Sequence, residues 1–116
     1  MADNIFAKII AKQIPAKIIF EDDQALAFCD INPQAPVHIL ILPKQDIANV
    51  AATNDEALLG HLLTISAVIA RQEGIDATGY RLVINKGRDA GESVPHLHVH
   101  LPVSYTHLTL PTKRIV

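Results

Sequence analysis

The chain of 116 residues suits one domain with its own core, and its 49% hydrophobic and 19% charged residues exclude a disordered protein. A net charge of −2 with scattered Lys and Arg gives no basic run for duplex nucleic acid or an anionic membrane surface. No apolar run is long enough for a membrane span, and the start of the chain lacks a signal-peptide pattern. We therefore expect a cytoplasmic protein with no nucleic-acid or membrane partner.

The first part of the chain predicts a helix and two short strands. Asn4 is a suitable N-cap for a helix over about residues 5–13, which Pro15 would end. Residues 18–20 and 25–28 are short apolar segments on either side of an acidic turn, which is typical of two paired strands.

The middle of the chain predicts a buried strand and one long helix. The apolar run 37–42 follows a loop with two prolines and ends at Pro43, as a central strand would. Asp55 or one of the two residues before it can cap a helix that continues to about Glu73, and Gly74 is a suitable C-cap.

The last part of the chain predicts two further strands, 80–85 and 94–101, separated by a polar loop over 86–93. Short links between strands, interrupted by two helices, favour an α+β fold with an antiparallel sheet in one domain over residues 1–101. The tail, 102–116, differs in character, and an edge strand, a disordered end and foreign sequence are the alternatives for it.

Three histidines at every second position are the most informative feature of the sequence. His96, His98 and His100 would project from one face of a strand, with the apolar residues between them in the core. A solvated strand face would more readily use Ser, Thr or Lys. The outer two Cα atoms would lie about 13 Å apart, too far to share one metal ion. A zinc site built from two of them with His38 is the second alternative.

The loop before these histidines predicts an anion site. Its two glycines let the backbone approach a ligand, and successive N–H groups in such a loop form an anion nest. Asn85 and Ser93 add an amide and a hydroxyl group. A neutral imidazole whose other nitrogen is held by a hydrogen bond is a good nucleophile, so loop and histidines together indicate attack on a phosphate.

The remaining histidines and the single cysteine receive simpler interpretations. His38 is expected on a strand beside the triple-histidine strand, where it would orient His96. His61 and His107 are expected at the surface. Cys29 is expected to be a small packing residue, because a lone cysteine forms no internal disulfide and suits a reducing compartment.

The segment 96–101 resembles the alternating signature of the histidine-triad superfamily, and most of the chain from residue 4 to 101 is similar to its Hint branch. That branch contains the purine nucleoside phosphoramidases. The resemblance implies a five-stranded antiparallel sheet with two helices, which dimerises into a continuous ten-stranded sheet. An apolar face kept for a second subunit fits the mean hydropathy of +0.23. The resemblance also implies hydrolysis of AMP–amine conjugates through a nucleotidyl-histidine, without metal or cofactor.

The same resemblance implies a role for particular residues. His98 would be the nucleophile, His100 and Ser93 would bind the phosphate or leaving group, and His96 and His38 would orient the site. Asp30 would bind the ribose hydroxyls. The full set of implied nucleotide-binding residues is Ile5, Phe6, Ile9, Phe28, Cys29, Asp30, Ile31, Asn85, Gly91, Ser93, Val94, His98 and His100.

The end of the chain departs from this family pattern. Pro102 stands where the signature has another apolar residue, and the tail lacks the Trp-containing ending that reaches across the family's dimer. Two alternatives to the phosphoramidase therefore stay open. One is a dinucleoside polyphosphate hydrolase or nucleotidyl transferase of the same superfamily, and the other is a non-catalytic nucleotide-binding interaction module.

Overall fold

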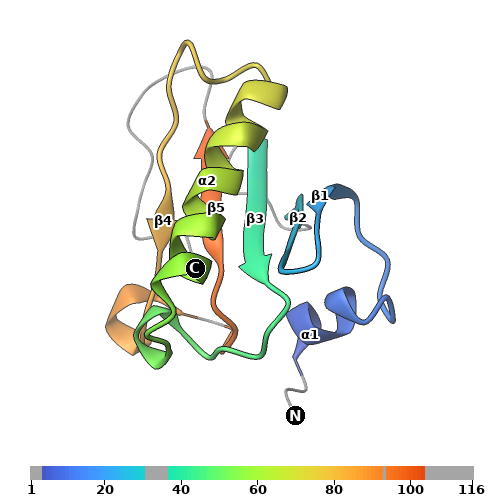
Figure 1. The fold of residues 1–116 in the computed structure, drawn as a ribbon, viewed down its shortest axis with the longest axis vertical. Coiled ribbons are helices and arrows are strands. Elements are labelled where there is room, and N and C mark those ends of the chain that lie inside the picture. Colours follow the sequence, from blue (N-terminus) through green and yellow to red (C-terminus); the bar gives the residue numbers. More distant parts are fainter. Residues whose placement is uncertain (1–3, 31–36, 93, 104–116) are drawn as a thin grey trace.

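A computed structural model describes residues 4–30, 37–92 and 94–103 (Figure 1). The described elements are α1 (Ile5–Ile10), β1 (Ile18–Glu21), β2 (Ala25–Cys29), β3 (Val37–Pro43), the 3₁₀ turn η1 (Val50–Ala52), α2 (Glu56–Gln72), β4 (Val83–Ile84), the 3₁₀ turn η2 (Arg88–Ala90) and β5 (Val99–Val103). Among these, no helix has both the length and the apolar character needed to cross a bilayer.

The five strands form one sheet in the order β1-β2-β3-β5-β4, and every neighbouring pair is antiparallel. This confirms the predicted α+β class with a five-stranded antiparallel sheet and two helices. Because the chain leaves the sheet through α2 after β3 and returns at the edge, β5 lies between β3 and β4 (Figure 1). The strand that carries His100 is therefore the immediate neighbour of the strand that carries His38.

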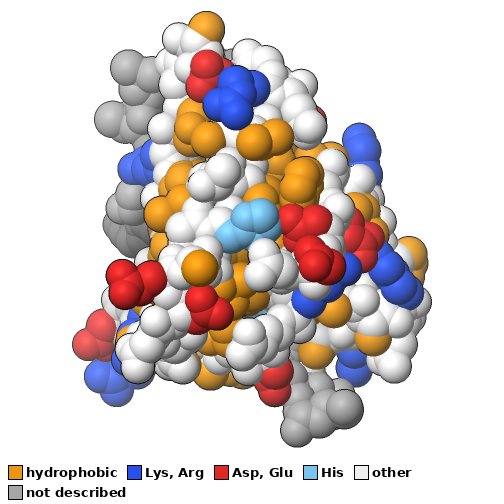
Figure 2. All heavy atoms as spheres, in the orientation of Figure 1, with side chains coloured by type: hydrophobic (Ala, Val, Ile, Leu, Met, Phe, Trp, Pro, Cys, Tyr) orange, Lys and Arg blue, Asp and Glu red, His pale blue; other side chains and the backbone are white. Residues whose placement is uncertain are grey.

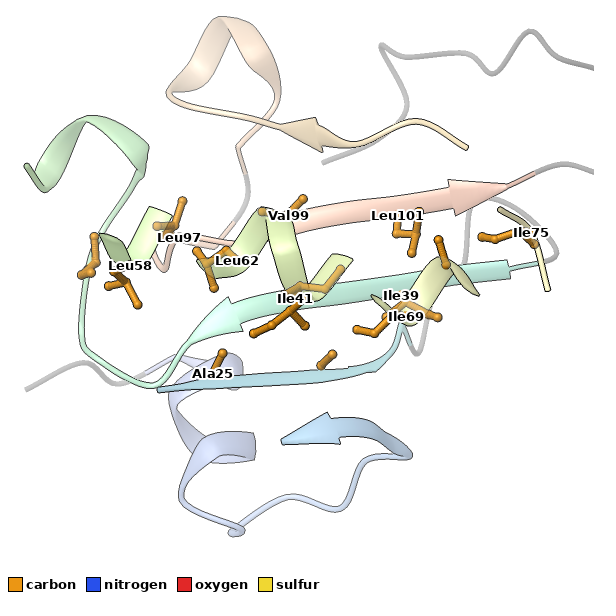
Figure 3. Close-up of a cluster of buried hydrophobic side chains, with 14 residues drawn as sticks. Ala25, Ile39, Ile41, Leu58, Leu62, Ile69, Ile75, Leu97, Val99 and Leu101 are labelled. Atoms are coloured by element: carbon orange, nitrogen blue, oxygen red, sulfur yellow. The ribbon is translucent and has the colours of Figure 1, made fainter. Parts of the chain in front are cut away.

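One face of the sheet packs against α2. Leu58, Leu62 and Ile69 of the helix meet Ile41 and other apolar side chains of β2, β3 and β5 in a single buried cluster (Figure 3). The helix begins where predicted, since the Asp55 carboxylate accepts a hydrogen bond from the amide of Leu58 at 3.0 Å. The cluster buries this face of the sheet under α2, and the site lies on the opposite face.

The opposite face packs against α1, which is shorter than predicted. It ends at Ile10 rather than near residue 13, because Lys12 adopts a left-handed conformation with φ of 63°. The amide of Lys12 donates to the Ile9 carbonyl and that of Gln13 to the Lys8 carbonyl, the two bonds of a Schellman turn. The helix is therefore stopped by its own last turn before Pro15 is reached.

The predicted strands 80–85 and 94–101 are also wrong in extent. The chain turns at residues 94–96, where the amide of His96 donates to the Val94 carbonyl at 2.8 Å and Pro95 has no amide to offer a neighbour. Strand β5 therefore starts at Val99. Strand β4 shrinks with it, because its two residues pair only with the first two residues of β5.

Several expectations fall outside the described residues. These are the loop 32–36, the tail 104–116 with His107, and the site residues Ile31 and Ser93.

On the face that carries α2, blue and red side chains are scattered among orange ones, and the blue ones do not gather into a stripe (Figure 2). This agrees with the absence of a basic run in the sequence.

Candidate active site

Strand register decides which side chains share the face that α1 covers. Phe28 of β2 lies opposite Leu40 of β3, and Leu40 lies opposite His100 of β5. Phe28 and Leu40 belong to the buried cluster that contains Phe6 of α1. Because alternate residues of a strand share a face, His38 lies on this side as well. The α1 face therefore collects histidines from two neighbouring strands.

His38 and His100 are hydrogen-bonded to each other, with 3.0 Å between Nε2 of His38 and Nδ1 of His100. Both residues are buried. The expectation that His38 orients His96 is wrong. In the β3–β5 register His38 lies opposite Pro102, so His100, two residues before Pro102, is the diagonal neighbour of His38. His96 is six residues before Pro102, about 20 Å away along an extended chain, and is too far to contact His38.

The other side of His38 faces Asp30, with 3.5 Å between His38 Nδ1 and a carboxylate oxygen. The amide of Asp30 also donates to the His38 carbonyl at 2.9 Å, so the β2–β3 ladder itself brings the two side chains together. Burial lowers the pKa of His38 below its ordinary value, and the Asp30 charge acts in the opposite direction. The family resemblance indicated Asp30 only as a ribose ligand, and no signal in the sequence pointed to this contact with His38.

His98 has the geometry of an activated imidazole. Its Nδ1 lies 2.6 Å from the carbonyl oxygen of His96. A carbonyl can only accept, so Nδ1 carries the proton and Nε2 carries the lone pair. The His98 ring lies edge-on to the rings of His100 and Phe6, with centroid distances of 4.9 Å and 4.8 Å. His98 and His100 thus lie side by side, as the alternation predicts.

His96 holds the turn before β5 in place. Its Nε2–H donates to the carbonyl of Pro43 at the end of β3, at 2.9 Å, and the residue is buried. The intervening Leu97, Val99 and Leu101 lie in the cluster under α2, which agrees with the predicted alternation. His96 therefore fixes the segment that supplies the carbonyl partner of His98.

The loop before the histidines uses its glycines for conformation. Gly87 and Gly91 have φ of 85° and 81°, which favour glycine over any other residue. The Gly87 amide donates to the Glu92 carboxylate at 2.9 Å, and the Gly91 amide donates to the Arg88 carbonyl. Two amides of the expected anion nest are therefore bonded inside the loop, and the sequence had not indicated Glu92 as the partner. Asn85, next to β4, is half-buried.

Part of the expected nucleotide pocket, five of its thirteen residues, lies in or against the cluster around Phe6. The expected residues that belong to the α1-side cluster or pack against it are Ile5, Phe6, Ile9, Phe28 and Val94. Cys29 is half-buried at the end of β2, immediately before Asp30. A buried apolar cluster thus lies beside the His98 ring.

Asp30, His38 and His100 also form a group whose nitrogen and oxygen atoms lie within 4.8 Å of one another. Three ligands of a zinc ion, at about 2.0–2.1 Å from it, would lie about 3.3 Å apart. The two nitrogens of His38 instead point to different partners, one to Asp30 and one to His100. The arrangement fits a chain of polar contacts better than a metal centre.

Comparison with known proteins agrees with this geometry. The family model of the HIT domain matches residues 11–107. An uncharacterized HIT-like protein of Synechococcus elongatus is 57% identical over 85% of this chain and 88% of its own. The purine nucleoside phosphoramidase of Escherichia coli K12 is 47% identical over 85% of each chain.

Among solved structures, a HIT family hydrolase from Legionella pneumophila superposes with a TM-score of 0.88. It is 42% identical and the match covers 95% of this chain and 99% of the other. Sequence, fold and the histidine arrangement all lead to one assignment, so the chain belongs to the HIT, or histidine-triad, family.

Proposed function

We propose that this protein hydrolyses purine nucleoside phosphoramidates of the AMP–amine type, with His98 as the nucleophile. The observation that carries the proposal is the 2.6 Å bond from His98 Nδ1 to the His96 carbonyl, because it leaves the lone pair on Nε2. The relative from Escherichia coli, at 47% identity, is named for this activity.

The reaction would proceed in two displacements. Nε2 of His98 attacks the α-phosphorus, the P–N bond to the amine breaks, and the amine leaves with a proton from His100 or Ser93, which the attacking water later replaces. Water then attacks the phosphorus of the nucleotidyl-histidine, which releases AMP and restores the imidazole. We propose that His100 and Ser93 bind the phosphate and the leaving amine. The His100 ring lies beside that of His98, and Ser93 is five residues before His98 in the chain.

The nucleotide would lie against the α1 face. We propose that the purine contacts the apolar side chains around Phe6, including Phe28 and Ile9, and that Asp30 binds the ribose hydroxyls. Ile5, Cys29, Ile31, Asn85, Gly91 and Val94 complete the proposed binding set. Because Phe6 and Ile9 are buried against the sheet, we expect small movements of α1 when a base enters.

The test is the substitution His98→Asn, with His61→Asn as the matched control on α2. An adenosine phosphoramidate is the substrate, and mass analysis of the denatured protein detects covalently bound AMP. We expect His98→Asn to lose at least about 10³-fold in turnover while it keeps its fold and AMP binding. The control should keep turnover near the parent level, and near-normal turnover in His98→Asn would rule out the mechanism.

A substrate panel separates the proposed activity from its relatives. Faster cleavage of a dinucleoside polyphosphate than of the AMP–amine conjugate would instead indicate a polyphosphate hydrolase or transferase. AMP binding without any product after long incubation would indicate a non-catalytic module.

A further inference from the structure

Asp30, His38 and His100 form one continuous chain of polar contacts that runs from the rim of the site to the neighbour of the nucleophile. Only its outer end reaches solvent, since the Asp30 side chain is 17% exposed and that of His38 is 1% exposed. The inner end, His100, lies edge-on to His98. A change at the carboxylate can thus reach the reacting centre through two buried rings.

The chemistry of the three groups fixes the direction of the chain. An ionised carboxylate only accepts hydrogen bonds, so it favours the form of neutral His38 that carries its proton on Nδ1. Nε2 of His38 then accepts, and Nδ1 of His100 must donate to it across the 3.0 Å contact. His100 is left with its lone pair on Nε2, where it can take up a proton. Without the carboxylate, both rings can take the opposite form.

We propose that Asp30 is a positioning residue for His100 and acts through His38. It selects the nitrogen at which His100 gains or releases a proton, and its charge stabilises the His38–His100 pair when that pair holds an extra proton. The titratable groups that face His38 in the described structure are Asp30 and His100, and His98 in turn faces His100. The part that concerns turnover rests on the function proposed above.

This role differs from ribose binding in what it predicts. A residue that only binds the ribose hydroxyls becomes irrelevant when the substrate has none. A residue that sets the tautomer of His100 keeps its effect on kcat with any substrate. The proposal therefore has one test in the free protein and one in the enzyme reaction.

The first test is NMR of the imidazole nitrogens in the ligand-free protein, which distinguishes the two neutral tautomers. Asp30→Asn keeps the shape of the side chain, and Asp23→Asn, at an exposed position in the β1–β2 turn, is the control of equal charge change. We expect protons on Nδ1 of both His38 and His100 in the parent and the control, and a shift towards Nε2 in Asp30→Asn. Because the Asn amide oxygen can still accept from Nδ1 of His38, Asp30→Ala is measured as well. Unchanged tautomers in both Asp30→Asn and Asp30→Ala would overturn the proposal, whatever the enzyme activity.

The second test uses an adenosine phosphoramidate and its 2′,3′-dideoxy analogue. We expect Asp30→Asn to lower kcat by at least about tenfold on both substrates and to raise KM mainly for the ribose substrate. In a His38→Gln background the same substitution should have little further effect on kcat. If the kcat loss disappears with the dideoxy substrate, Asp30 is only a ribose ligand. If the parent cleaves neither substrate, the proposed function fails, but the NMR result still decides the role of Asp30.

Discussion

The burial of His38 makes the stability of the fold depend on pH. Burial lowers the pKa of this residue from its ordinary 6.5, although the Asp30 charge works against that shift. The unfolded chain therefore binds this proton more readily than the folded one, and stability falls as pH drops below about 6.5. We expect thermal unfolding to show a falling Tm between about pH 7.5 and pH 5.5, with a smaller fall in His38→Gln.

The matched comparison is the same pH series on His61→Gln. His61 lies on the other face of the sheet, where its Nε2 contacts the Asp22 carboxylate at 2.7 Å and its side chain is 32% exposed. Its removal should leave the contribution of His38 in place. If Tm fell equally with decreasing pH in the parent and in His38→Gln, the buried imidazole of His38 would not be the cause of the loss of stability at low pH.

At the same scale, the sequence predicts faces well and partners poorly. Alternation alone places His98 and His100 on one side and Leu97 and Val99 on the other, as the structure does. The partner of His38 depends on the register between β3 and β5, which no local pattern in the chain encodes. The sequence therefore predicts His96 as the partner of His38, whereas the structure has His100 in that place.

At the scale of elements, alanine substitutions of a glycine inside α2 and of a glycine just beyond its end should have opposite effects on stability. Gly74, just past the end of the helix, has φ of 75°, and its amide donates to the Arg71 carbonyl. Gly60 lies inside α2. A Cβ would meet nothing within 4 Å at either position, so only backbone preference differs. We expect Gly74→Ala to cost about 1 kcal/mol and Gly60→Ala to stabilise by about 0.5–1 kcal/mol, measured by urea unfolding.

Equal effects from the two substitutions would contradict this account of the helix end.

The two ends of α2 were predicted from the sequence more closely than those of α1 and β5. The helix with a cap residue at one end and a glycine at the other was located to within two residues, since Asp55, one of three candidate caps, Gly74 and an apolar stripe agree. The extent of α1 depends instead on a left-handed Lys12, and the start of β5 depends on the turn in which the His96 amide donates to the Val94 carbonyl. Neither has a strong sequence signal.

At the scale of the whole molecule, the two edges of the sheet are not equivalent. Strand β1 has an irregular register between Ile18 and Phe20, and Glu21 at its end forms ion pairs with Lys12 and Lys44 at 2.9 Å and 2.8 Å. Bulges and charges of this kind protect an edge from pairing with another chain. Strand β4 has only two residues, which also limits pairing, but its register with β5 is regular and it exposes the apolar Ile84. Of the two, β4 is the edge better suited to continue the sheet into a second subunit.

We therefore expect a homodimer that joins two sheets through β4, as the family resemblance implies. Light scattering should give twice the chain mass of 12.6 kDa. Ile84 and Ile18 are equally exposed, at 39% and 40%, so Ile84→Lys and Ile18→Lys form a matched pair. The first should shift the protein towards monomer, because a buried charge at an interface has no partner, and the second should not. Dissociation by Ile18→Lys alone would assign the interface to β1, and a monomeric parent would mean that each active site is built from a single chain.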